Sequence, residues 1–300
     1  MIDGTAQAPI VVGVPSEATR PDDLELPVRW AAQEAQVRGA ALWLATAYLG
    51  RPRDAVGGDP LGTAAHRAVR GLEGESARLG KEYPDLRVAM FARCGTAVGV
   101  LGDMGVEAGL IVVGRQGRGR VAEAIHGSVT AGRLRRTSSP VVVVPPSAAY
   151  VDRGAPIVVG VGTHGPAAAT LGFAYSEAAV TGASVRLVHC RRVSHGVGRM
   201  AGTDRDAWEA LVRAVEPYRT SFPHVRTSVE LIDGHPGEAL TKESVTAALV
   251  VLGPGRGWTR GWRLGRLGPV GHEVLGRAAS PVVLVRDSGA HRRTKGCGRS

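Results

Sequence analysis

The sequence predicts an α/β protein built from two tandem doubly wound sheets, each with five parallel strands. The length of 300 residues is enough for about two domains. Short apolar runs alternate with helical segments along the chain, as in parallel sheets that helices cover on both faces. The segment PIVVGV at 9–14 also returns word for word at 156–161. These observations indicate two copies of one domain.

The first helix of each copy follows the first strand and ends at a glycine. The helix predicted in RWAAQEAQVRGA ends at Gly39, and the helix predicted in FAYSEAAVTGA ends at Gly182. Each glycine is a suitable residue for a helix C-terminus. Later segments align without gaps, which pairs Gly95 with Gly234, and SSPVVVV matches ASPVVLV. The strands predicted in this way span 10–14, 41–48, 86–92, 110–113 and 141–144 in the first copy, and 157–161, 184–190, 225–232, 249–252 and 282–285 in the second.

The remaining segments connect or extend these elements. Polar, glycine-rich stretches at 50–62 and 191–203 are predicted to be mobile loops. The linker at 145–155 is short, so the two copies should touch. The expected domains are 1–147 and 154–287, followed by a basic disordered tail at 288–300.

A glycine-rich basic loop follows the fourth strand of the first copy. Its spacing is Gly114, two residues, Gly117, nine residues, and then Gly127-Ser128 at the start of a helix. Open α/β sheets bind ligands at the carboxyl ends of their strands, and glycines let backbone N–H groups approach a ligand closely. The start of a helix favours an anion, and a serine hydroxyl adds a donor. The loop therefore predicts a phosphate cradle.

The pattern G-x2-G-x9-G-[ST], after LIVVG and before a helix and SPVVVV, resembles the nucleotide-binding signature of the universal stress protein family. The resemblance implies the strand order 3-2-1-4-5 in each copy, a fold like that of adenine nucleotide alpha hydrolases, and ATP, with Mg²⁺, as the ligand. It also implies a pseudo-twofold unit in which Val141 to Val144 pair with Val282 to Val285, since an open apolar edge favours association. The candidate site residues are Gly114, Arg115, Gly117, Arg118, Gly127, Ser128, Val129, Val14 and Pro15.

The two copies depart from the family pattern in different ways. ATP-binding relatives carry an Asp just after strand one, whereas this chain has Pro15 in the first copy and Gly162 in the second. In the second copy Pro269 stands opposite Ser128, and proline offers neither an N–H nor a hydroxyl to a phosphate. We therefore expect nucleotide binding in the first copy and none in the second.

Three classes of function remain open: a non-catalytic nucleotide sensor that acts on a protein partner, a slow ATPase, and a ligand-free scaffold or polyanion binder. No carboxylate pair, nucleophile elbow or metal-ligand cluster is recognised in the sequence, which favours a role other than catalysis. Arg115 and Arg118 either bind phosphate or are solvated. The arginine-rich stretch around Trp258 and Trp262 either packs on a domain or stacks on nucleic acid, and packing is the favoured interpretation.

Composition indicates the environment of the protein. The net charge of +10 comes mostly from arginine and predicts salt-dependent contacts with polyanions. Cys94, Cys190 and Cys297 are scattered and suggest neither a metal site nor a disulfide framework. No signal peptide or membrane-length apolar run is recognised, so a soluble cytoplasmic protein is expected.

Overall fold

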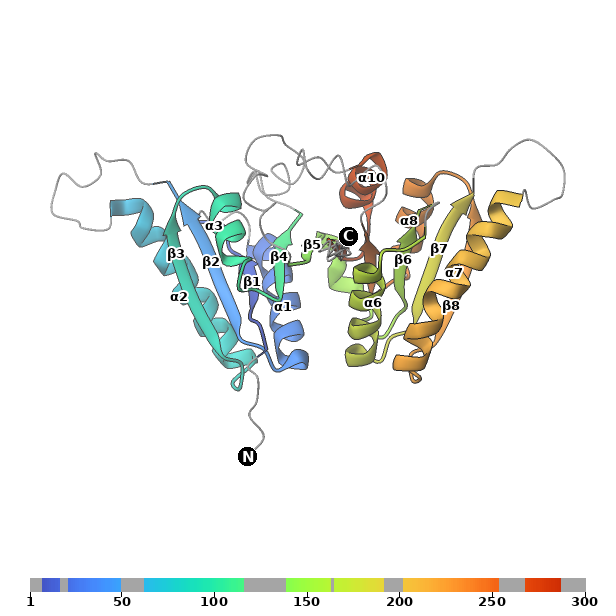
Figure 1. The fold of residues 1–300 in the computed structure, drawn as a ribbon. Helices are drawn as coiled ribbons and strands as arrows, with labels where there is room; N and C mark the ends of the chain where they lie inside the picture. Colours follow the sequence, from blue (N-terminus) through green and yellow to red (C-terminus); the bar gives the residue numbers. More distant parts are fainter. Residues whose placement is uncertain are drawn as a thin grey trace, which may run out of the picture.

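The computed structural model contains one mixed sheet of ten strands with helices on both faces (Figure 1). The structure describes residues 7–16, 21–49, 62–115, 139–162, 165–191, 202–253 and 268–286. The predicted helix after Gly127, the stretch around Trp258 and the tail lie outside these ranges, as do the two predicted loops except for their ends.

The elements follow the alternation that the sequence predicts. The strands of the first half are β1 (Ile10–Gly13), β2 (Leu42–Tyr48), β3 (Val88–Cys94), β4 (Leu110–Gly114) and β5 (Val141–Val144). Its helices are α1 (Pro21–Arg38), α2 (Gly62–Glu82) and α3 (Ala97–Met104), and the short helix η1 (Pro146–Tyr150) opens the linker. The strands of the second half are β6 (Ile157–Val161), β7 (Val185–Arg191), β8 (Thr227–Asp233), β9 (Leu249–Leu252) and β10 (Val282–Leu284). Its helices are α6 (Ala168–Thr181), α7 (Gly202–Ser221), α8 (Pro236–Glu243) and α10 (Pro269–Arg277).

Each half of the sheet has the strand order 3-2-1-4-5. The full order is β3-β2-β1-β4-β5-β10-β9-β6-β7-β8, and all strands within one half are parallel. The predicted strand order is confirmed, and the predicted strands lie within two residues of the observed bounds.

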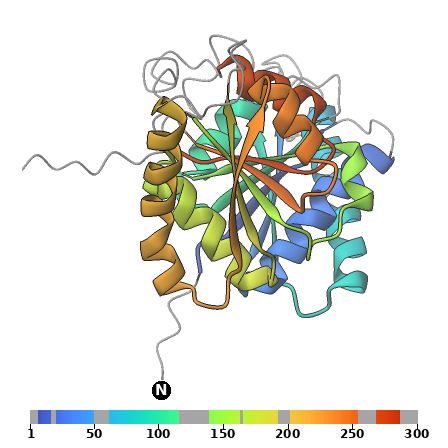
Figure 2. The same ribbon diagram turned by 90° about the vertical axis from the view of Figure 1, so that its right-hand side faces the viewer.

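The two halves join through their last strands. β5 and β10 pair antiparallel, with Val142 opposite Val283 at the centre of the junction. Both side chains are completely buried. The predicted pairing through the last strands is therefore confirmed, and it turns two five-stranded sheets into one continuous sheet. The halves form a V in Figure 1, and their strands cross in the view of Figure 2, as sheet twist requires.

Alternate residues of the strands face two different layers of helices. Val12, Leu44 and Val142 pack in one apolar cluster with residues of α1, α2, α6 and α7. Val11 and Val143 pack in a second cluster, on the opposite face, with residues of α3, α8 and α10. Each cluster contains residues from both halves of the chain, so the apolar core continues across the domain junction.

The predicted helix ends are confirmed at both glycines. α1 ends at Arg38 and Gly39 has a φ of 64°, while α6 ends at Thr181 and Gly182 has a φ of 75°. These left-handed backbone angles carry little cost for glycine. No described helix combines the length and apolar character needed to cross a membrane.

Two equivalent glycines let a helix pack closely on the first strand of each half. A Cβ atom on Gly160 would lie 2.8 Å from Leu240 Cδ1 and 2.9 Å from Leu252 Cδ2, whereas one on Gly13 would lie 3.2 Å from Leu101 Cδ1. Gly160→Ala should therefore destabilise the protein by about 1–3 kcal/mol, because overpacking forces neighbouring side chains to move. Gly13→Ala is the matched control and should cost clearly less in denaturant unfolding. Equal losses would contradict this difference in packing.

Candidate functional site

The predicted site begins where β1 and β4 end side by side. These strands are neighbours although they are not consecutive, which is the switch point at which open α/β sheets bind ligands. Val12 pairs with Val112, so the same register places Val14 level with Gly114. The N–H of Val14 donates to the Ala45 carbonyl at 2.8 Å, and Pro15 beyond it is exposed. The structure thus brings Val14, Pro15, Gly114 and Arg115 to one end of the sheet.

The remaining candidate residues lie outside the described part of the chain. They are Gly117, Arg118, Gly127, Ser128 and Val129. Pro15 occupies the position of the family's acid, and it supplies neither a carboxylate nor an N–H. The described residues at this edge, 14–16 and 114–115, therefore offer a ligand backbone groups and the Ser16 hydroxyl but no carboxylate.

Arg115 is directed toward the second domain. Its backbone N–H donates to the Val144 carbonyl at 2.8 Å, and its guanidinium donates to the Ala278 carbonyl at 2.6 Å. Ala278 is the C-cap of α10, where the helix dipole favours a cation. Burial lowers the pKa of Arg115. Of the two expectations for this residue, phosphate partner or solvated arginine, the structure shows neither. It shows a contact between domains.

A serine hydroxyl strengthens the same contact. Ser147, in the helix η1 that opens the linker, donates through Oγ to the Ala279 carbonyl at 2.7 Å. The segment at the end of α10 is thus held by side chains from the end of β4 and from the linker.

The equivalent edge of the second copy is arranged differently. A Cβ atom on Gly253 would lie 2.0 Å from Thr170 Oγ1, so the Thr170 side chain of α6 is packed directly on this glycine. Thr170 is buried, and its hydroxyl has no hydrogen-bond partner among the residues described. α10 begins at Pro269 with Gly268 as its N-cap, and no side chain caps this helix start. Proline suits the first position of a helix, where its missing N–H would have no partner within the helix.

His189 is a core residue. It lies within β7, two residues before the strand ends at Arg191, is 4% exposed, and its Nδ1 donates to the Val161 carbonyl at 3.0 Å. This placement gives His189 a structural role in the sheet.

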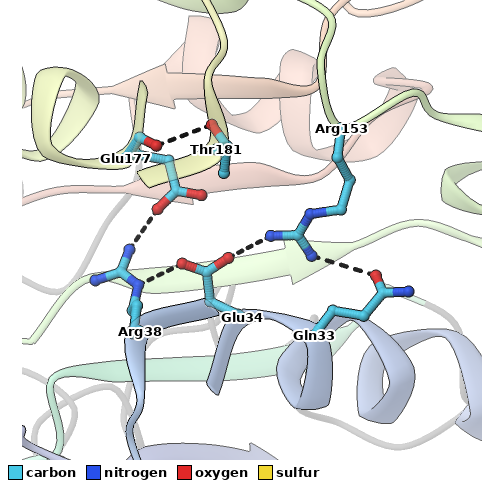
Figure 3. A network of polar contacts seen from close by, with 6 residues as sticks. All are labelled: Gln33, Glu34, Arg38, Arg153, Glu177 and Thr181. Atoms are coloured by element: carbon cyan, nitrogen blue, oxygen red, sulfur yellow. Dashed lines mark hydrogen bonds and ion pairs between the residues drawn. The ribbon is translucent and has the colours of Figure 1, made fainter. Parts of the chain in front are cut away.

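The structure also shows a pair of buried carboxyl groups that the sequence interpretation missed. Glu34 of α1 is 0% exposed and Glu177 of α6 is 3% exposed. Arg38 forms ion pairs with both, and Arg153 of the linker pairs with Glu34 (Figure 3). The prediction that the chain contains no carboxylate pair was therefore wrong. A signal was present, since aligning Gly39 with Gly182 puts Glu34 opposite Glu177.

The two carboxyl groups have opposite pKa shifts. Burial raises the pKa of Glu177, and the facing Glu34 carboxylate raises it further, to about 8. Burial acts in the same direction on Glu34, but Arg38, the hydrogen bond from Glu177 and Arg153 together lower its pKa below the ordinary value. Near neutral pH the pair therefore holds one proton, on the Glu177 side.

Comparisons with known proteins agree with this architecture. A universal stress protein of Mycobacterium tuberculosis is 28% identical over 309 residues, which cover 96% of this chain and 99% of that protein. The crystal structure of a universal stress protein from Archaeoglobus fulgidus matches with a TM-score of 0.56 at 15% identity, covering 92% of this chain and 96% of that one. A further Archaeoglobus fulgidus universal stress protein, solved in complex with dAMP, is 27% identical over 44% of this chain and 97% of its own, with a TM-score of 0.34.

A family model gives the most direct assignment. The model of the universal stress protein family matches residues 9–145 and again residues 155–286. Each match contains one five-stranded half of the sheet. The chain therefore belongs to the universal stress protein family and carries two of its domains in tandem.

Proposed function

We propose that the chain is a non-catalytic nucleotide-binding module whose ligand site, for ATP or a related nucleotide, lies in the first domain. The observation that carries the proposal is the position of Gly114, which ends β4 beside the end of β1 at the switch point of the sheet. The complete spacing from Gly114 to Ser128 continues from there. Backbone donors after a strand and at a helix start suit a phosphate.

The second domain serves as the structural partner in this proposal. Thr170 packs on Gly253, where the first domain has the start of its glycine-rich loop after Gly114. Pro269 opens α10 where Ser128 stands in the first copy, so a hydroxyl and an N–H are missing there. One nucleotide per chain is therefore expected.

The proposal does not include catalysis. The described residues at the β1–β4 edge, 14–16 and 114–115, contain no carboxylate that could activate a nucleophile or bind a metal ion. Mg²⁺ would enter bound to the phosphates of the nucleotide. The role of the site is then to sense a ligand rather than to convert it.

Arg115 connects the site to the domain junction. It directly follows Gly114, and its guanidinium holds the end of α10 in the second domain. A ligand that changes the backbone after Gly114 would also change this contact. Ligand occupancy would in this way alter the surface that a protein partner meets near the junction.

Calorimetric titration tests the proposal. Mg-ATP, ADP, AMP and cyclic AMP are titrated into the full chain, and saturation at one nucleotide per chain is expected. Gly127→Val and Ser128→Pro should weaken the affinity by at least about 100-fold, which corresponds to about 2.7 kcal/mol. Gly127→Val adds a side chain where the backbone is expected to approach the phosphate closely. Ser128→Pro removes a hydroxyl and a backbone N–H from the cradle.

The second domain provides a matched control. Gly268→Val makes the same change at the position equivalent to Gly127 and should leave the nucleotide affinity unchanged. Absence of binding by the unmodified chain at millimolar nucleotide would overturn the proposal. Equal losses in Gly127→Val and Gly268→Val would also contradict the assignment to the first domain.

A further inference from the structure

A cluster of four charged side chains lies between the two domains, away from the β1–β4 edge. Glu34 and Arg38 come from the last turns of α1, Glu177 comes from α6, and Arg153 comes from the linker (Figure 3). The Arg38 guanidinium donates to both carboxyl groups, while Arg153 donates to Glu34 and, at 3.3 Å, to Gln33 Oε1. The cluster therefore joins α1, α6 and the linker through side chains alone.

The cluster follows the pseudo-twofold symmetry of the fold. The alignment that pairs Glu34 with Glu177 also pairs Trp30 with Phe173. Arg153 lies over the Trp30 ring, 5.3 Å from its centroid, and Arg38 lies over the Phe173 ring at 5.8 Å. The second copy has Thr181 at the position of Arg38, so the linker supplies the second guanidinium. Each half thus presents one carboxyl group and one aromatic ring beneath a guanidinium.

The guanidinium groups are shared unequally between the two carboxyl groups. Glu34 accepts from both arginines, whereas Glu177 accepts only from Arg38, which it shares with Glu34. The Glu34 side chain is 0% exposed and that of Glu177 is 4% exposed, so both groups are almost completely removed from bulk water. A second carboxylate beside the first is therefore unfavourable, and one proton stays between them.

We propose that Glu34, Arg38, Arg153 and Glu177 form a proton-operated latch that holds the two domains and the linker together. The latch is closed while a proton is held between the two carboxyl groups. When the proton leaves, the facing carboxylates repel each other, and the contact of α1 with α6 and with the linker loosens. This property is independent of nucleotide binding.

Among the described residues, the charged groups that face Glu177 belong to the same cluster. From α1 it meets Glu34 and Arg38, and from the linker the nearest charge is Arg153. The strands beneath it contribute Ile157 and Leu249, which are apolar. On its own helix, the Thr181 hydroxyl donates to the Glu177 backbone carbonyl at 2.9 Å. A cavity of about 10 Å³ beside Glu177 has room for about one water molecule.

The pH dependence has a defined sign. The ordinary pKa of the Glu177 side chain is 4.5, and in the folded chain it is about 8. Between these two pH values Glu177 is protonated in the folded chain and ionised in the unfolded chain. A state that binds more protons loses stability as the pH rises, so the closed latch weakens across this window and changes little above it. Glu177→Gln keeps a side chain of the same shape that cannot ionise.

Hydrogen exchange of the full chain tests the proposal. Protection of peptides from α1 (29–38) and α6 (173–181) is compared with that of Glu177→Gln at the same pH, which cancels the intrinsic effect of pH on exchange. Between pH 6 and pH 9 the unmodified chain should lose protection at least about tenfold relative to the variant. The melting temperature should fall in parallel by about 3–6 °C relative to Glu177→Gln.

Two further variants sharpen the test. Glu34→Gln removes the facing carboxylate and should reduce the loss of protection between pH 6 and pH 9, whereas the burial of Glu177 remains. Glu209→Gln is the control, since Glu209 also faces two arginines, Arg205 and Arg213, but its side chain is 50% exposed and lies within α7. This control should behave like the unmodified chain. Identical pH profiles for the unmodified chain and either Glu177→Gln or Glu34→Gln would overturn the proposal.

Discussion

Replacing Glu34 with alanine should lower the free energy of unfolding by about 2–4 kcal/mol, because it removes a completely buried carboxylate that two guanidinium groups share and leaves a cavity between the domains. The substitution removes the acceptor that Arg38 and Arg153 share. Arg153 then has no carboxylate partner in the cluster, while Arg38 keeps Glu177. Chemical denaturation at pH 7, followed by circular dichroism, measures the loss.

An exposed ion cluster provides the comparison for Glu34. Glu209 Oε1 lies 3.5 Å from Arg205 Nε, and Glu209 Oε2 lies 3.6 Å from Arg213 Nη1. The Glu209 side chain is 50% exposed. Glu209→Ala should cost less than about 1 kcal/mol, since solvent screens exposed pairs. A loss below about 1 kcal/mol for Glu34→Ala as well would show that the interdomain cluster adds nothing to stability.

An aspartate in place of Val142 should destabilise the protein by more than about 4 kcal/mol. Val142 is completely buried and pairs with Val283 at the centre of the β5–β10 junction. A carboxylate at this position would lose its hydration without gaining a charged partner, because the neighbouring cluster consists of buried apolar residues from both halves, mostly valine, leucine, isoleucine and alanine. The expected result is a chain that fails to fold, or one whose unfolding midpoint falls sharply in guanidinium chloride.

The same substitution at an exposed valine tests whether the effect of Val142→Asp comes from burial. Val37 on α1 is 48% exposed, so Val37→Asp should change stability by less than about 0.5 kcal/mol. Val142→Thr removes less apolar surface than the aspartate and should give an intermediate loss. A stable, cooperative Val142→Asp variant would mean that the two halves fold and persist without the valine junction.

Most of the fold could be predicted because each helix or strand is encoded twice, by two different sequences that can be compared. A strand that is ambiguous in one copy is supported by its equivalent in the other, as with PIVVGV at 9–14 and 156–161. The boundaries were less predictable. The third strand was predicted from residue 86, but β3 begins at Val88, because it pairs there with Leu42 and Leu86 belongs to the preceding turn.

The candidate site was only partly predictable. Glycine spacing identifies the end of β4 from local sequence, and the structure places Gly114 beside β1 as expected. The role of Arg115 could not be read in this way, because its acceptor, Ala278, lies 163 residues further along the chain. Its side chain is fixed by the packing of one domain on the other, which spacing within one motif does not encode.

The carboxyl pair was missed for a related reason. Helical periodicity places Glu34 on one face of α1, but it does not say which other helix covers that face. Near a twofold axis, equivalent residues of the two copies meet each other. A buried acidic residue at the same position in both copies is therefore the signal that should have indicated a pair.

The short connection between β5 and β6 has a consequence for how the pair assembles. In a homodimer the junction would form only above a certain protein concentration, whereas here residues 145–155 keep the two halves within reach of each other. A short linker gives an effective concentration on the order of millimolar, whatever the amount of protein present. Assembly is then insensitive to expression level, and either copy can diverge in its loops without losing its partner.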